Sequence, residues 1–261
     1  IDQAGKDGAI TVEEARSLET SLDIVEGFRF DSGYVSPQFI NNERRGAVVY
    51  EDAYILVTDA KIDSVEEMLP VLELVARENK PLVIVSENVE GQALAALIMN
   101  AVRGTMRVAA VKAPRYGEER RGILKDLAIS VGATFVTTEL GNSLKDIKLT
   151  DFGTARKIDI SRDFTTIVDG RGDGKKIQEQ IENLKQSIEE NESMQECERL
   201  QERITRLASG VAIIRVGAST EIEMIEKKHR LEDALEAVKS AQERGIVPGG
   251  GVALVRTIPK N

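Results

Sequence analysis

The stretch between residues 64 and 104 constrains the fold more than any other, because it places a short strand between two unusually apolar helical segments. The first segment follows Ser64 and has the Ser-x-x-Glu pattern of a capping box, in which side chains bond the free backbone N–H groups at a helix start. Residues 81–86 are β-branched and bounded by proline and polar residues, which predicts a buried strand. The second segment, 93–102, ends at Gly104, since glycine readily adopts the left-handed turn past a helix.

Both helical segments are apolar around most of their circumference, whereas a surface helix needs only one apolar stripe. Two explanations are open at this point. Either the helices are buried on two sides, or one side is an exposed apolar surface that binds a partner. The functional interpretation depends on this choice.

Strands and helices alternate from residue 54 to residue 137, which is the pattern of an α/β layer. After residue 150 the pattern changes to a pair of strands, a helical hairpin with a break near Asn191, a last strand and a long charged helix that ends at Gly245. The predicted fold class is mixed α/β, with β-layers flanked by helices and a helical hairpin. This body is expected to be inserted into a small discontinuous domain made of both ends of the chain.

The net charge of −9 and the pI near 5.0 argue against a nucleic-acid-binding surface, which requires a basic patch. No apolar run approaches the roughly 20 residues that cross a bilayer, so no membrane contact is expected. The single cysteine, Cys197, cannot form an internal disulfide, which fits a reducing compartment. The chain begins without methionine and ends where a helix begins, so we expect a piece of a longer protein.

Several motifs suggest chemistry but are weak by themselves. The Asp-Gly-Arg-Gly-Asp-Gly run at 169–174 lacks the Lys-Ser/Thr of a phosphate loop and has an arginine where an EF-hand needs an oxygen ligand, which favours an exposed turn. His229 is the only histidine, so no multi-histidine metal site is expected. The glycines at 249–251 are consistent with an anion site at a helix start or with close backbone packing. Asp233, judged from its surroundings, is one more charge on a helix face.

Taken together, a series of motifs resembles the group I chaperonins, the Hsp60 family of ring-shaped, ATP-driven folding machines. The matching stretches lie at 25–31, 33–37, 66–73, 87–91, 108–114, 230–235 and 249–254, and the similarity runs nearly from end to end of the chain. The resemblance implies an apical domain at 26–211, intermediate-domain segments at 1–25 and 212–244, and the start of an equatorial segment at 245–261. The family's Gly-Asp-Gly-Thr-Thr phosphate loop does not occur in these 261 residues.

In this family, two apical helices form a groove that binds non-native polypeptides and the co-chaperonin lid. The matching positions are Leu69, Leu72, Leu94, Ile98 and Met99, with Tyr34 and Phe39 from a nearby loop. The five helix positions are therefore expected to face outward, and the other apolar residues inward. An unfolded chain offers apolar side chains in no fixed order, so a flexible residue such as Met99 suits its receptor.

The resemblance also implies roles that need the complete protein. Asp233 matches the carboxylate that activates water beside ATP and Mg²⁺, and Gly250 matches a glycine near the nucleotide. Gly27 and Gly210 match the upper hinge and Gly245 the lower hinge. The fragment itself is expected to bind no cofactor and to have no ATPase activity. It is expected to be monomeric, whereas the full-length protein forms heptameric rings in the bacterial cytoplasm, with an organellar matrix as the alternative.

Two other functions are weighed against this one. A passive module that holds unfolded chains without ATP would use the same groove. An α/β enzyme of the nucleotide-binding type is disfavoured, because no Gly-x-Gly-x-x-Gly follows a strand.

The sequence departs from the family in several places. Gln38 replaces a groove tyrosine, and Ser32 replaces an arginine that pairs across subunits with the position of Glu221. Ser209 replaces a hinge glycine, and Arg244 replaces an acidic residue at the lower hinge.

Overall fold

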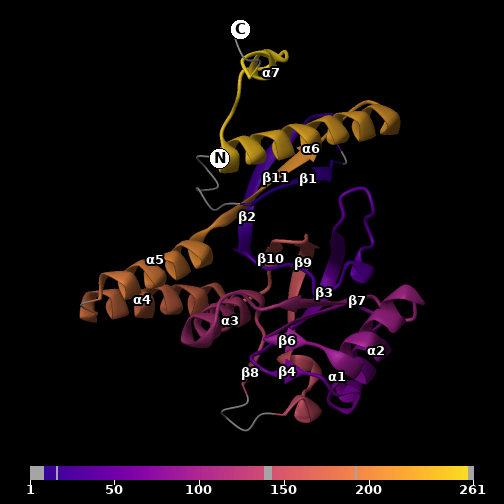
Figure 1. Cartoon of the computed structure of the whole chain (residues 1–261). Helices are drawn as coiled ribbons and strands as arrows, with labels where there is room; N and C mark the ends of the chain where they lie inside the picture. The colour runs from indigo at the N-terminus through magenta and orange to yellow at the C-terminus, as the bar shows by residue number, and fades with distance from the viewer. Residues whose placement is uncertain (1–8, 16, 138–142, 192, 258–261) are drawn as a thin grey trace. The chain divides into compact units, whose positions relative to one another are not determined.

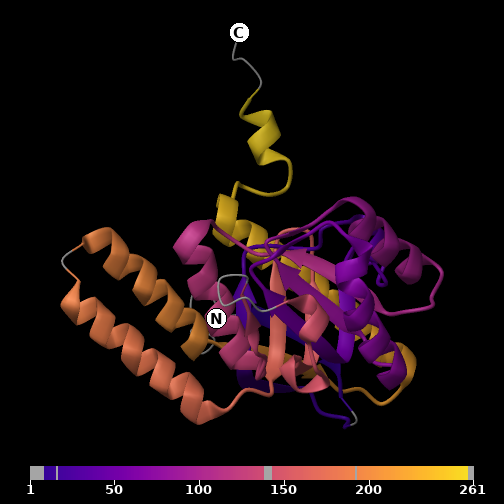
Figure 2. The same cartoon turned by 90° about the horizontal axis from the view of Figure 1, so that it is seen from below.

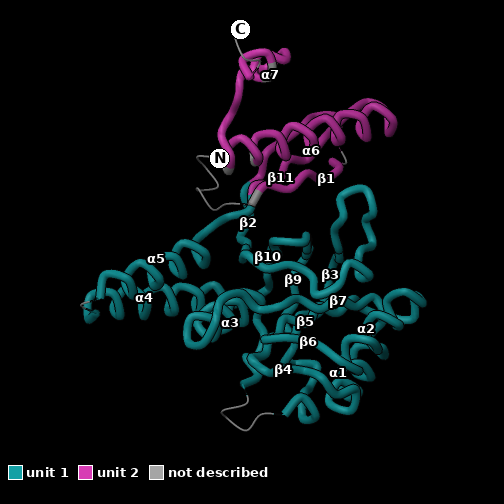
Figure 3. The backbone as a smooth tube through the Cα atoms, in the orientation of Figure 1, with its two compact units in different colours: residues 1–9, 24–211 teal, residues 10–23, 212–261 magenta. Residues whose placement is uncertain are grey.

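The computed structural model describes residues 9–15, 17–137, 143–191 and 193–257. The chain forms two compact units, which Figure 3 colours separately. Unit 1 consists of residues 1–9 and 24–211, and unit 2 of residues 10–23 and 212–261. Strands β2 (Ser21–Phe30) and β11 (Gly210–Val216) carry the chain from one unit to the other.

Unit 1 is built on a mixed sheet in the order β2-β10-β9-β3-β5-β7, with β8 paired to the end of β3. Its further strands are β3 (Val48–Thr58), β5 (Leu82–Ser86), β7 (Val108–Lys112), β8 (Phe135–Val136), β9 (Gly153–Ile160) and β10 (Thr165–Gly170). Strands β3, β5 and β7 are parallel, whereas β3, β9, β10 and β2 pair antiparallel. The predicted mixed α/β class is confirmed.

Helices α1 (Val65–Glu78), α2 (Gly91–Val102) and α3 (Gly117–Val131) follow β3, β5 and β7 along the chain. All five residues of β5 are buried, as expected for a parallel strand covered on both faces. Short elements complete the unit: the strand pair β4 (Lys61–Ile62) and β6 (Asn88–Val89), and the 3-10 turns η1 (Pro37–Phe39), η3 (Leu144–Asp146) and η4 (Leu149–Asp151).

Helix α1 begins differently from the predicted capping box. The Ser64 hydroxyl accepts a hydrogen bond from the backbone N–H of Glu66 at 3.3 Å, one residue earlier than a capping box requires. The helix ends at Asn79, whose φ of 51° places it in the left-handed region. Pro70 lies inside the helix without ending it.

The predicted helical hairpin consists of α4 (Gly174–Glu190) and α5 (Met194–Ala208), which lie side by side in Figures 1 and 2. Ile181, Leu184, Leu200 and Ile204 form a small apolar cluster between the two helices. Leu207 of α5 packs against both this cluster and the main core of unit 1, and polar contacts also join the hairpin to α3.

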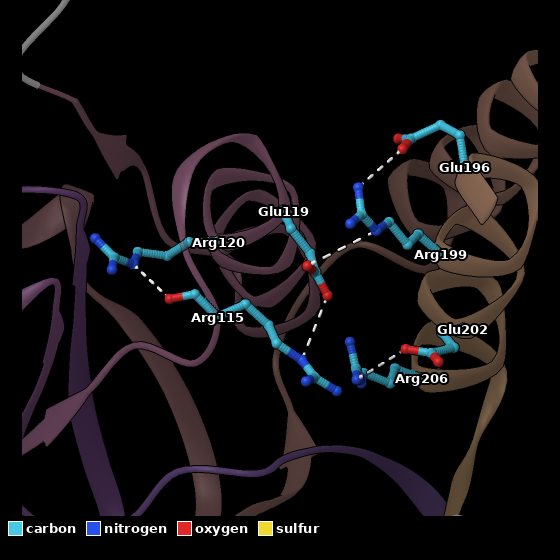
Figure 4. A network of polar contacts seen from close by, with 7 residues as sticks. All are labelled: Arg115, Glu119, Arg120, Glu196, Arg199, Glu202 and Arg206. Carbon is cyan, nitrogen blue, oxygen red and sulfur yellow. Dashed lines mark hydrogen bonds and ion pairs between the residues drawn. The ribbon is translucent and has the colours of Figure 1, made fainter. Parts of the chain in front are cut away.

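Those contacts centre on the buried carboxylate of Asp126 in α3. It accepts hydrogen bonds from Arg203 Nε and Nη2 of α5, at 2.7 and 2.9 Å, and from Gln180 Nε2 of α4 at 2.9 Å. Figure 4 shows a second, exposed link in which Glu119 of α3 pairs with Arg115 and Arg199. The hairpin is thus attached to α3 by one buried and one exposed set of charges.

The Asp-Gly-Arg-Gly-Asp-Gly run connects β10 to α4. Its Asp173 accepts a hydrogen bond from the backbone N–H of Lys175 at 2.9 Å and so caps α4. A Cβ atom on Gly172 would lie 2.2 Å from the carbonyl oxygen of Ile129, at the end of α3. Close packing therefore explains this glycine. Among the described residues, no group of three or more His, Cys, Asp or Glu side chains could hold a metal ion.

Unit 2 pairs β1 (Ala9–Glu14) with β11 and contains α6 (Glu221–Arg244) and α7 (Val252–Val255). The Thr220 hydroxyl caps α6 by accepting from the Glu223 N–H, and Gly245 ends the helix with a φ of 76°. Lys228 Nζ meets Glu14 Oε1 at 2.8 Å, which fastens α6 to β1. None of the helices in the described ranges is long and apolar enough to cross a membrane.

Candidate functional site

Helices α1 and α2 lie next to each other in unit 1 and are buried on one side only (Figure 1). The buried residues of α1 are Met68, Val71, Leu72 and Val75, which recur at the spacing of one helix face. In α2 the fully buried residues are Ala93 and Leu97. Leu69, Met99 and Val102 lie outside these stripes and are exposed, so the two helices are not buried on two sides.

The residues predicted for a groove differ widely in exposure. Leu69 and Met99 are 46% and 50% exposed. Leu94, Ile98 and Tyr34 are half-buried and pack against the core of unit 1.

The expectation that Leu72 faces outward is wrong, because its side chain is only 7% exposed. Leu72 lies four residues after Met68 and three before Val75, so it shares their buried face. Phe39 is 2% exposed and belongs to the core, although it was expected in the groove. The short turn η1, capped by the Ser36 hydroxyl, places its ring there.

One face of α2 forms an open pocket of about 400 Å³, which we call the α2 pocket. Six lining residues come from α2 and its C-cap: Gln92, Ala95, Ala96, Met99 and Asn100 lie in the helix, and Arg103 is the C-cap residue. Val65, at the start of α1, and Thr105, just after α2, complete the lining. The six helix residues are spaced by three or four positions, so they share a single face of the helix.

The end of the pocket is held in place by the way α2 terminates. The N–H of Thr105 bonds the carbonyl of Asn100 at 3.1 Å, and the N–H of Gly104 bonds that of Ala101 at 3.1 Å. This pair of bonds is the Schellman motif, and it needs the left-handed φ of 68° that Gly104 has. The Asn100 side chain is fixed as well, because it donates to the Ala96 carbonyl and accepts from the Thr105 hydroxyl, both at 2.9 Å.

The chemistry of the α2 pocket is that of a binding surface. Val65, the two alanines and Met99 supply apolar area, and Arg103 is the only charged residue in the lining. The lining contains no acid–base pair and no nucleophile set against a base.

Of the predicted site residues, only Met99 lines the α2 pocket; the other lining residues were not predicted. The helical spacing of these residues in the sequence could have predicted that they share one face. Positions 92, 95, 96, 99, 100 and 103 form the stripe opposite the most apolar residues of α2.

The residues expected to act near a nucleotide are not brought together with other polar groups. Asp233 is exposed on α6, and among the described residues its carboxylate makes no ion pair or hydrogen bond. Gly250 lies before α7 with a φ of 62°, and a Cβ atom there would meet nothing within 4 Å.

The predicted hinge glycines fall into two kinds. A Cβ atom on Gly27 would lie 2.1 Å from Val211 Cγ2, and one on Gly210 would lie 2.6 Å from Ile24 Cγ2. These two glycines therefore allow close packing within unit 1. Gly245, by contrast, has a positive φ and open surroundings at the end of α6.

The fold and the site define a mixed α/β protein with an open, largely apolar pocket on the outer face of a helix. The model of the TCP-1/cpn60 chaperonin family matches residues 3–260, and the chain belongs to that family. This membership gives the protein a chaperone role.

Proposed function

We propose that unit 1 is the apical domain of a group I chaperonin, and that the α2 pocket together with Leu69 binds non-native polypeptides and the co-chaperonin. The observation that carries this proposal is the exposure of Leu69 and Met99 on helices whose other faces already fill the core. Residues 1–25 and 212–244 would then be the intermediate domain, and residues 245–261 the start of an equatorial segment.

Weak and repeated contacts suit this function. Burying apolar area stabilises a complex by about 25 cal/mol per Å², so one bulky side chain in the pocket contributes about 1.5–3 kcal/mol. A single site of this kind binds loosely and with little sequence specificity. In a seven-membered ring of identical subunits, several such contacts on one unfolded chain would combine into avidity.

ATP and Mg²⁺ belong to the proposal for the assembled protein. We propose that the described residues do not form a nucleotide site by themselves, because Asp233 is exposed and makes no ion pair or hydrogen bond among them, and a Cβ atom on Gly250 would meet nothing within 4 Å. The carboxylate of Asp233 would serve ATP hydrolysis only beside phosphate-binding groups from elsewhere in a complete chaperonin. We therefore propose that these 261 residues bind polypeptides without hydrolysing ATP.

Passive, ATP-independent binding is the second candidate. It is favoured by one observation: every residue of the α2 pocket lies between Val65 and Thr105 in unit 1. Capture of a polypeptide therefore needs no group from unit 2.

The test is the binding of a fluorescently labelled denatured protein to single variants. Met99→Gln and Leu69→Gln remove exposed apolar area without opening a core cavity, so each should weaken binding several-fold while leaving the fold intact. Val102→Gln is the matched control, because Val102 is 67% exposed on the same helix but does not line the pocket. Equal binding by all three variants and the unchanged protein would overturn the proposed site.

A further inference from the structure

Arg103 gives the α2 pocket a charge that has no partner among the described residues. Its side chain is exposed, and in the part of the chain that the structure describes its guanidinium forms neither an ion pair nor a hydrogen bond. Nearby arginines differ in this respect. Arg107 donates to the Asn79 carbonyl at 2.6 Å, and Arg120 pairs with Glu87 at 2.6 Å.

No acidic side chain lines the pocket, so Arg103 supplies the one charge in its lining although the chain carries a net charge of −9. The other polar lining groups do not offset this charge. Asn100 and Thr105 bond each other and the backbone, and Gln92 is neutral. A carboxylate is the side-chain group that best complements a free guanidinium, because it accepts two parallel N–H bonds.

The helix geometry sets where that carboxylate must lie relative to an apolar side chain. Met99 and Arg103 are four residues apart, which is about 6 Å along the axis of α2. In an extended peptide, side chains at positions i and i+2 point to the same side and are about 6.6 Å apart. The short side chains of Ala95 and Ala96 leave room beside Met99 for a bulky apolar residue.

We propose that the α2 pocket prefers extended polypeptide segments in which an Asp or Glu lies two positions from a bulky apolar residue. The apolar side chain packs against Ala96 and Met99, and the carboxylate pairs with Arg103. This inference rests on the proposed function, since it names the kind of segment that the polypeptide-binding site selects. Apolar contacts alone would give the site little sequence specificity, and pairing with Arg103 adds a preference for segments that carry a carboxylate.

The test uses three labelled peptides of the same length that differ only at the position two residues from a central Leu, which is Glu, Gln or Lys. On the unchanged protein at physiological salt, the Glu peptide should bind two- to tenfold more tightly than the Gln peptide, and the Lys peptide most weakly. Raising the salt concentration should reduce these differences, because the pair is exposed. On the Arg103→Glu variant the order should reverse.

Arg77→Glu is the matched control, since Arg77 is also exposed and lies on α1 outside the pocket lining. It should leave the order of the three peptides unchanged. If Arg103→Glu does not reverse the order, or if Arg77→Glu changes it as much, the carboxylate preference is wrong. The proposed function fails separately: it is overturned if Met99→Gln leaves the binding of the neutral Gln peptide intact.

Discussion

The guanidinium of Arg203 forms two hydrogen bonds with the carboxylate of Asp126, although Asp126 is only 1% exposed and the two residues are 77 positions apart. Gln180 supplies a third bond to the same carboxylate. Three helices therefore meet at one buried charge. A charge withdrawn from water in this way is tolerated only while its partners remain in place.

Arg203→Ala is expected to destabilise unit 1 by about 3 kcal/mol, because it leaves Asp126 buried without its main counter-charge. Urea denaturation measures the free energy of unfolding, and hydrogen exchange in α4 and α5 should rise most. Arg199 provides the comparison, because its pairs with Glu196 and with Glu119 of α3 are more exposed, and Arg199→Ala should cost less than about 1 kcal/mol. A similar small loss for both variants would show that the buried charge is not what attaches the hairpin.

Ionisation of the Tyr50 hydroxyl should make the protein less stable at alkaline pH. Burial raises the pKa of its hydroxyl to about 12, with Arg107 acting weakly in the opposite direction. Between pH 10 and 12 the unfolded chain loses this proton and the folded chain keeps it, so the free energy of unfolding falls by about 2–3 kcal/mol as pH rises. The full contribution is present below pH 10.

Urea midpoints measured across this pH range test the prediction. Tyr50→Phe should lower stability by about 1 kcal/mol at neutral pH, because the hydroxyl donates to the Val108 carbonyl at 3.2 Å. Between pH 10 and 12, the free energy of unfolding of this variant should also fall less than that of the unchanged protein. An unchanged decline would mean that other groups cause it.

Gly27→Ala should destabilise unit 1 by about 1–3 kcal/mol, because the new methyl group would overlap the Val211 side chain and press on the Ile167 carbonyl. The double variant Gly27→Ala/Val211→Ala should recover part of this loss relative to the sum of the two single changes. A double-mutant cycle from thermal denaturation gives the coupling. Strictly additive losses would contradict the close-packing explanation of this glycine.

Asp233→Asn should change the free energy of unfolding by less than about 0.5 kcal/mol, since the carboxylate is exposed and makes no ion pair or hydrogen bond among the described residues. The same change in a complete chaperonin should abolish most ATP turnover if the proposed role is right. Stability and phosphate release are the two measurements. Turnover by these 261 residues that disappears in Asp233→Ala would overturn the assignment of ATP chemistry to the assembled protein.

Local patterns predicted several element ends closely. Helix α3 ends at Gly132 and α6 at Gly245, and the hairpin breaks at Asn191, because each signal depends on residues adjacent in the chain. Strand β3 was predicted less well. It begins at Val48 instead of Tyr54, since its pairing with β9 extends the strand through the polar residues Glu51 and Asp52.

The surface of α1 and α2 likewise has features that the sequence predicts and features that it does not. Two apolar helices beside a strand, and an excess of apolar residues on them, follow from the sequence between residues 64 and 104. Which side chains remain exposed does not follow from it. Leu69 and Leu72 are alike as residues, yet the core stripe of α1 includes Leu72 and leaves Leu69 half exposed.

The sequence by itself determined the fold class, the order of the elements and the resemblance to chaperonins, because these depend on periodicity, turn residues and motifs that are read along the chain. Only the tertiary structure decided that one face of α2 is an open pocket, that Arg103 at its rim has no partner in the described part of the chain, and that Asp126, Gln180 and Arg203 meet between three helices. The reason is physical: burial and charge pairing are set by groups far apart in the chain, and no local pattern encodes which of them meet.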